Sequence, residues 1–201
     1  MNAETRRRRV PALAPDERRA ALIAATLPLL RTHGAAVTTR QIAEAAGVAE
    51  GTIFGVFPDK ASLLSAALCT AFEPEPVLRA LSAIDPGATL RERLKDAAAI
   101  LTRRVESSVP LMMLARTMPL DSSPFAALVD GRRRLTEAVA DLIEPDKHLL
   151  RRSPDATSRL LFALVVSAAR GDLPHEQFTP DEIVAVLLDG LLHVPSDPGE
   201  A

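Results

Sequence analysis

Residues 38–60 read TTRQIAEAAGVAEGTIFGVFPDK, and this stretch decides how the fold is interpreted. Thr38 and Gln41 form a T-x-x-Q capping box, which predicts the start of a short helix. Gly47 ends that helix, and a second short helix is expected at about 49–57. The two helices carry apolar side chains that would close a small core, namely Ile42, Ala43, Val48, Ile53 and Phe57. The start of the second helix is then left facing outward.

A longer helix is expected before this stretch. Pro15 stands at a first helical position, and Gly34 is a stop signal. Pro28 lies inside the pattern, where a bend is expected rather than a break. The three segments together predict a helix-turn-helix, because a major groove accepts one helix whose first residues reach the base edges. The alternative is a three-helix packing element with no role in DNA binding.

The remainder of the chain has many helix start signals and no sustained polar–apolar alternation, so the fold class is all-α with about nine helices. The segment 73–76, Glu-Pro-Glu-Pro, is interpreted as a stop. The later helices are expected over 60–71, 89–108, from Pro110 through Leu114, from Ser123-Pro124 through Leu142, over 154–170 and over 180–192. The predicted organisation is a basic arm at 1–14, a helix-turn-helix domain at 15–57 and a helical domain at 58–201.

The spacing within residues 38–60 resembles the TetR family of bacterial one-component regulators, over roughly residues 15–70. The family pattern T-x-x-x-I-A-x-x-A-G-V-x-x-G-T-x-aromatic-x-x-F-x-x-K is met at Thr38, Ile42, Ala43, Ala46, Gly47, Val48, Gly51, Thr52, Phe54, Phe57 and Lys60. The resemblance implies a homodimeric repressor that binds a palindromic operator in double-stranded DNA. It also implies release by a small apolar or amphipathic effector.

The resemblance also assigns roles at the DNA. Thr39 and Thr52 correspond to hydroxyls that contact phosphates, and Lys60 corresponds to a phosphate-binding lysine. Three departures weaken parts of this resemblance. Ala49 replaces the usual Ser or Thr and lacks a capping oxygen, and Gly55 and Val56 stand where the family commonly has side chains that touch phosphates. The acidic Glu50 also faces a polyanion. The residues expected at the DNA within this motif are Thr38, Thr39, Arg40, Glu50, Gly51, Thr52, Phe54, Gly55 and Lys60.

Three of these residues are expected at the bases, and a fourth at the helix backbone facing the duplex. An arginine at position 40 can bind guanine through two hydrogen bonds, and Glu50 can accept a hydrogen bond from a cytosine amino group. Phe54 replaces a usual tyrosine and keeps an apolar contact to a thymine methyl group. Gly51 allows the helix backbone to approach the duplex.

The charge distribution points to the same end of the chain. Residues 1–60 carry nine Lys and Arg against six acids, net +3, whereas the rest of the chain has a net charge of −5. Arg6, Arg7, Arg8 and Arg9 lie ahead of the first helix, with no following apolar region that would make a signal peptide. This arm is expected to contact the DNA backbone or a minor groove. The alternative is a solvated tail.

Composition excludes several other classes. The chain has 201 residues, 47% of them hydrophobic, with one cysteine and neither Trp nor Tyr, which excludes disorder and a disulfide framework. No apolar run approaches the roughly 18 residues of a membrane span, so a cytoplasmic protein without membrane contact is expected. The four histidines are far apart, and no nucleophile or phosphate-loop motif is present. We therefore expect no catalytic residues, no metal and no cofactor.

Two groups of apolar residues in the helical domain are candidates for functional sites. The first is an effector cavity lined by Phe72, Met112, Met113, Met118, Phe125 and Phe162, for which ordinary core is the alternative. The second is a dimer interface, because the final helix is apolar nearly all round; its alternative is burial within the monomer. Its expected residues are Leu161, Val165, Val184, Leu187, Leu188 and Leu191. The competing function is a helical protein-interaction module without DNA binding.

Overall fold

The computed structural model describes residues 14–171 and 178–190, and within these ranges the chain is all-helical. The described residues form nine α-helices and two short 3-10 helices. In chain order these are α1 (Pro15–His33), η1 (Gly34–Ala36), α2 (Thr39–Ala45), α3 (Gly51–Phe54), α4 (Lys60–Phe72), α5 (Glu75–Ser82), α6 (Leu90–Thr117), α7 (Ser123–Ile143), η2 (Glu144–Leu149), α8 (Pro154–Arg170) and α9 (Pro180–Asp189). The predicted fold class is confirmed.

Several of the predicted helix starts carry side-chain caps. Thr38 accepts a hydrogen bond from the backbone N–H of Gln41 at 3.2 Å, and Gln41 Oε1 accepts one from the N–H of Thr38 at 2.8 Å. Equivalent capping boxes at Thr89 and Thr179 open α6 and α9. Each box satisfies two N–H groups that a helix end leaves without partners, so these sequence signals fix where the helices begin.

Two proline-containing segments behave differently from the sequence-based expectation. α4 ends at Phe72, at the stop predicted for 73–76, but an unexpected helix, α5, begins after two intervening residues, at Glu75. Pro76 sits in the first turn of α5, where no N–H is needed. The expected break at Pro110 is also absent, since α6 runs through it as one helix. Buried Val105 and Leu111 lie on the two sides of this proline, and their packing offsets the lost backbone hydrogen bond. The sequence does not predict α5 and predicts α6 as two helices, so the expected number of helices still agrees with the structure.

Two further helices are shorter than expected. α3 ends at Phe54 instead of 57, because the N–H of Gly55 closes a tight turn onto the carbonyl of Thr52 at 3.2 Å. α9 ends at Asp189, where Gly190 adopts a positive φ of 80°. The expected continuation to 192 lies outside the described residues. By contrast, α1 continues through Pro28 to Gly34, as predicted.

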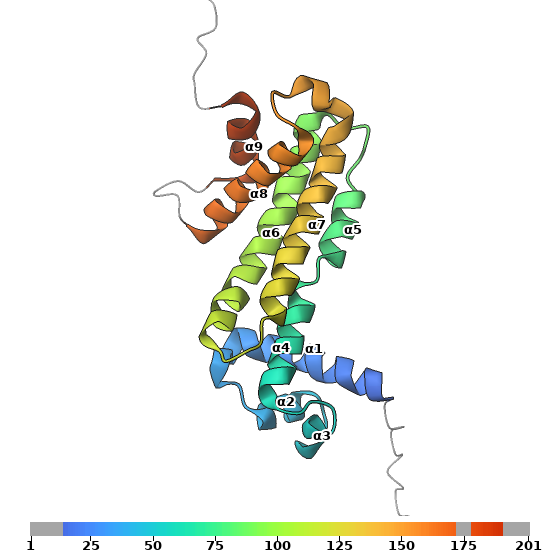
Figure 1. Ribbon diagram of the computed structural model, residues 1–201, viewed down its shortest axis with the longest axis vertical. Coiled ribbons are helices and arrows are strands. Elements are labelled where there is room, and N and C mark those ends of the chain that lie inside the picture. The colour runs from blue at the N-terminus through green and yellow to red at the C-terminus, as the bar shows by residue number, and fades with distance from the viewer. Residues whose placement is uncertain (1–13, 172–177, 191–201) are drawn as a thin grey trace, which may run out of the picture.

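The apolar interior is divided into two cores. What we call the head core joins α1, α2, α3 and α4 to the last part of α6, and its buried residues are Leu22, Leu30, Val37, Ile42, Ala43, Ile53, Phe57, Leu63, Leu64, Ala67, Leu68, Phe72, Leu111 and Ala115. What we call the body core lies among α5–α9 and contains Leu81, Ile84, Leu90, Leu94, Ala97, Ala98, Leu101, Val105, Leu135, Val139, Ile143, Leu161, Phe162, Val165, Ile183 and Val184. In Figure 1, α1–α3 lie at one end and α4 leads from them to the long helices of the body.

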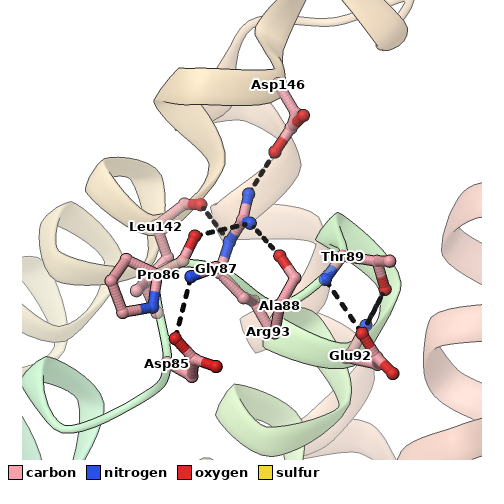
Figure 2. A network of polar contacts seen from close by, with 9 residues as sticks. All are labelled: Asp85, Pro86, Gly87, Ala88, Thr89, Glu92, Arg93, Leu142 and Asp146. Atoms are coloured by element: carbon pink, nitrogen blue, oxygen red, sulfur yellow. Dashed lines mark hydrogen bonds and ion pairs between the residues drawn. The ribbon is translucent and has the colours of Figure 1, made fainter.

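A buried arginine joins three segments at the far end of the body (Figure 2). Arg93 is 4% exposed, and its guanidinium donates to the carbonyls of Leu142 at 3.1 Å and Ala88 at 2.5 Å. It also forms an ion pair with Asp146 in η2. One side chain of α6 therefore binds the end of α7, the start of η2 and the loop before α6. Sequence reasoning missed this residue, because a charge inside an amphipathic helix is usually solvated.

None of the helices in the described ranges is long and apolar enough to cross a bilayer.

Candidate DNA-binding and effector sites

The helix-turn-helix is held by its own small core. Ile42 of α2 and Ile53 of α3 are fully buried, and Phe57 is 2% exposed. Gly47 adopts a φ of 67° between the two helices, a conformation that side chains other than glycine rarely adopt. Arg19 of α1 lies over the Phe57 ring, with its guanidinium carbon 4.4 Å from the ring centre. This cation–π contact ties α1 to the motif, and sequence reasoning did not find it.

The outward surface of the motif carries the predicted DNA-binding residues. Thr38, Arg40, Glu50, Gly51, Phe54 and Gly55 are exposed, whereas Thr39, Thr52 and Lys60 are half-buried. Phe54 is 53% exposed, which is unusual for an aromatic side chain without a partner in the described residues. A Cβ on Gly51 would meet nothing within 4 Å, so packing inside the protein does not require glycine there. The exposed surface is consistent with an approaching partner at α3.

Thr39 and Glu50 are joined to each other in the structure. The hydroxyl of Thr39 at the start of α2 donates to Glu50 Oε1 just before α3, at 2.5 Å. The predicted roles of the two residues, at a phosphate and at a base, remain predictions. The bond lowers the cost of the acidic side chain at this surface, because the carboxylate already has a donor before DNA arrives. Sequence reasoning missed this pair, since the two residues are eleven positions apart.

Lys60 begins α4 beside the motif. Its ammonium group lies 3.4 Å from the carbonyl of Ala35 in η1, so the head of this side chain is held close to the end of α1. Asp59 caps α4 by accepting from the N–H of Ser62 at 2.7 Å, and this hydrogen bond lowers the pKa of the Asp59 carboxyl. The predicted contact of Lys60 with a phosphate is not tested by this geometry.

The described part of the head has no excess of positive charge. Residues 14–60 contain five Lys and Arg and five Asp and Glu. The positive excess noted for residues 1–60 therefore resides in residues 1–13. The arginines at positions 6–9 lie outside the described residues, and their role stays a prediction.

A cavity of about 230 Å³ lies between α4, α6, α7 and α8. Three of the six residues predicted to line an effector cavity do line it, namely Phe72, Met112 and Phe162. The other three do not: Met113 is 53% exposed, and Met118 and Phe125 pack against the head core instead. Sequence spacing placed all six on apolar faces but did not distinguish which face each helix turns to the cavity.

The lining of the cavity comes from both cores. Side chains in or packed against the head core contribute Phe72, Met112 and Leu128, and those in or packed against the body core contribute Val105, Val109, Leu135, Phe162 and Val166. A molecule in this cavity would therefore contact both parts of the protein.

Three arginines also line the cavity. Arg104 is half-buried, while Arg132 and Arg170 are exposed. Arg132 lies over the Phe162 ring, with its guanidinium carbon 5.1 Å from the ring centre. Arg104 donates to the carbonyls of Ala71 at 2.6 Å and Glu73 at 3.4 Å, at the end of α4.

The residues predicted for a dimer interface lie in three different places. Leu161, Val165 and Val184 have no exposed surface and belong to the body core, so the expectation that they face a partner is not met in this structure. Leu187 and Leu188 are half-buried against the same core. Leu191 lies outside the described residues. On α8 the exposed large apolar side chain is Leu160, which is 51% exposed and which sequence reasoning did not select.

The described residues contain no group of three His, Cys, Asp or Glu side chains placed to hold a metal ion. Cys69 lies on α4, where burial raises the pKa of its thiol and so disfavours the nucleophilic thiolate. Neither observation points to catalytic chemistry.

Comparison with known protein families supports the helix-turn-helix interpretation of the N-terminal part of the chain. Residues 22–67 match the family model for bacterial regulatory proteins of the tetR family. No curated protein matches the chain.

Solved structures share the fold over most of the chain. A TetR-family transcriptional regulator from Rhodococcus sp. is 22% identical, with 87% of this chain and 96% of that chain covered and a TM-score of 0.59. A TetR-family protein from Mesorhizobium loti MAFF303099 is 16% identical over 89% and 98% of the two chains, with a TM-score of 0.68. The transcriptional regulator FadR from Bacillus subtilis, solved with stearoyl-CoA, is 14% identical over 86% and 99%, with a TM-score of 0.62.

The match at residues 22–67 favours the helix-turn-helix interpretation over that of a helical interaction module without DNA binding. Proteins of this family are transcription factors and not enzymes. Residues 22–67 therefore form an N-terminal domain of the tetR family of bacterial regulatory proteins, and the chain shares its overall fold with the solved structures.

Proposed function

We propose that the protein is a homodimeric repressor that binds a palindromic operator and is released by a small effector in the cavity between α4, α6, α7 and α8. The observation that carries this proposal is the outward surface of α2 and α3, where Arg40, Gly51 and Phe54 are exposed beside Lys60. A DNA-binding regulator works where the chromosome is, so the proposed location is the cytoplasm.

At the DNA, α3 enters the major groove. Arg40 binds a guanine through two hydrogen bonds, and Phe54 contacts a thymine methyl group. Lys60 and the hydroxyls of Thr39 and Thr52 contact phosphates, which position the motif without reading sequence. Because the described part of the head is electrically balanced, the arginines at 6–9 supply much of the attraction to the polyanion.

A homodimer fits this function, because a helix-turn-helix normally reads a site with two-fold symmetry. The surface that we assign to the interface is the outer face of α8. Leu160, Ala163, Leu164 and Ser167 share this face at helical spacing, and Leu160 is 51% exposed. Leu187 and Leu188 of the adjacent α9 keep part of their surface free.

The assembly is tested by Leu160→Glu, which would place two unpaired carboxylates in the interface. We expect sedimentation to show a dimer for the wild type and a monomer for the variant, because burying an unpaired charge costs several kcal/mol. Leu149→Glu is the matched control, since Leu149 is 63% exposed and lies in η2, outside α8 and α9. A monomeric wild type, or a dimeric Leu160→Glu, would refute this interface.

DNA binding is tested by selecting bound sequences from a random duplex pool and then measuring affinity by fluorescence anisotropy at several salt concentrations. A palindromic consensus and a steep loss of affinity with salt are expected. Binding without sequence preference would contradict the proposal of an operator.

A further inference from the structure

We propose that the cavity takes a small amphiphile with one carboxylate, which binds the Arg104 guanidinium and thereby competes with the end of α4 for that side chain. This inference rests on the proposed effector function and adds the chemical class of the ligand and the residue through which it acts.

The polarity of the cavity lining selects for a negative charge. The described residues that line it include three arginines, a serine and no acidic residue. The remaining lining is apolar, with Phe72 and Phe162 as its largest members. A neutral apolar ligand would leave the cationic side untouched, and a strongly polar ligand would leave the apolar side without contacts. An apolar body with one anionic end matches both parts.

Arg104 is the arginine best placed for this anion. It is half-buried, and within the described structure its guanidinium donates to two neutral backbone carbonyls and to no carboxylate. Burial lowers the pKa of its guanidinium, because the positive charge has lost water without gaining a counter-ion. A carboxylate is a stronger acceptor than a carbonyl and fits the fork of the guanidinium through two hydrogen bonds.

The size of the cavity limits the ligand. Typical pockets for small molecules occupy about 300–1,000 Å³. At about 230 Å³ the cavity of this chain is smaller than that range. A medium-length alkyl chain or one aromatic ring with a carboxylate is the scale that fits.

The same side chain links the cavity to the DNA-binding motif. Ala71 and Glu73, whose carbonyls Arg104 holds, stand at the end of α4, and Lys60 stands at its start beside α3. Gly131 of α7 lies close to this end as well, since a Cβ there would be 3.2 Å from the carbonyl oxygen of Phe72. A carboxylate that draws the guanidinium away removes two hydrogen bonds from the end of α4. The position of α4 then changes at the end remote from the DNA.

The ligand class is tested with straight-chain carboxylates of six to twelve carbons and the matched primary amides, titrated calorimetrically into the full-length protein. At least one carboxylate should bind tenfold or more tightly than its amide, as expected for hydrogen bonds to charged groups of about 1.5–3 kcal/mol. Arg104→Gln should abolish this difference, whereas Arg103→Gln, an exposed neighbour outside the cavity, should keep it. Equal affinities of every acid and its amide for the wild type would overturn the proposal.

A second variant and a second readout separate the possible failures. Arg104→Lys keeps the charge and should retain a preference for the carboxylate, with weaker binding. The best carboxylate should also release the wild type, but not Arg104→Gln, from its selected duplex in the anisotropy assay. Carboxylate binding without release would overturn the competition at α4. Failure of the ligand-free wild type to bind any duplex would instead refute the proposed repressor function, which the calorimetry does not depend on.

Discussion

Replacing Arg93 by methionine should destabilise the protein far more than the same change two residues earlier, at Arg91. Both arginines are on α6, and both form an ion pair in the structure. Arg93 is 4% exposed, whereas the side chains of Arg91 and its partner Asp189 are 42% and 58% exposed. The comparison therefore isolates burial, because helix and residue type are matched.

The magnitude follows from what each change leaves behind. Methionine keeps most of the aliphatic volume of Arg93 but leaves the Asp146 carboxylate and the carbonyls of Leu142 and Ala88 without their donor. Breaking a buried ion pair costs about 3–5 kcal/mol. Because the Asp146 side chain is 28% exposed and regains some water, we expect about 2–4 kcal/mol. The exposed pair at Arg91 should contribute about 0–1 kcal/mol.

Urea unfolding followed by far-ultraviolet circular dichroism measures both free energies of unfolding. Asp146→Asn, alone and combined with Arg93→Met, completes a double-mutant cycle, and a coupling of at least about 1 kcal/mol is expected for groups in direct contact. If Arg93→Met costs within about 0.5 kcal/mol of Arg91→Met, the reasoning from burial is wrong. Additive effects in the cycle would likewise contradict a direct bond between Arg93 and Asp146.

Three further predictions concern the DNA and the pH. Arg40→Ala should cost about 1–3 kcal/mol and relax the base preference at one position of each half-site, whereas Lys60→Ala should weaken binding to all sequences and reduce the salt slope by about one; equal sequence preference in the wild type and Arg40→Ala would remove Arg40 from base reading. Deleting residues 1–9 should lower affinity and flatten the salt dependence while the circular dichroism spectrum is unchanged, and an unaltered slope at low salt would identify the arm as a solvated tail. The hydroxyl of Ser65 donates a hydrogen bond to the Asp121 carboxylate at 2.8 Å and lowers the pKa of that carboxyl. The ionised carboxylate therefore adds to the free energy of unfolding at neutral pH, above the unfolded pKa of about 3.9. This contribution is lost as the pH falls through the lower folded pKa. Asp121→Asn should therefore reduce the free energy of unfolding at pH 7 and make it fall less steeply below about pH 4, and identical acid profiles would contradict this assignment.

The parts of the fold that sequence reasoning predicts are those governed by local hydrogen bonds. The capping boxes at Thr38, Thr89 and Thr179 each involve residues three positions apart, so the sequence contains the whole interaction. Proline is harder to interpret. Pro28 and Pro110 both lie inside helices, yet the sequence predicts this only for the first, because the packing that holds α6 together across Pro110 involves residues far away in sequence.

The candidate sites also differ in how far the sequence predicts them. The exposed face of the helix-turn-helix follows from a motif of fixed spacing, and the sequence therefore indicates Arg40 and Phe54. The cavity depends on which face each helix turns inward, so Phe72 lines it while Met113 is at the surface. The ties of Arg104 to α4 and of Arg93 to Asp146 join residues more than thirty positions apart, and no local pattern encodes such contacts.

The division of the apolar interior into a head core and a body core bears on how the protein opens. Among the described helices, only α6 contributes buried residues to both cores, and α7 contributes to the body core and packs partly buried side chains against the head core. On α6, Leu101 belongs to the body core and Ala115 to the head core, and Pro110 interrupts the backbone hydrogen bonds between them. We therefore expect the two cores to be separate units of cooperative unfolding.

Native-state hydrogen exchange would reveal these two units. The backbone amides of α1 and α4 should open at one free energy, and those of the first half of α6 should open at another. The cavity lies where the two units meet, so a bound molecule contacts both of them. Because a ligand stabilises every unit that must be folded to bind it, occupation of the cavity should raise both opening free energies by the same amount.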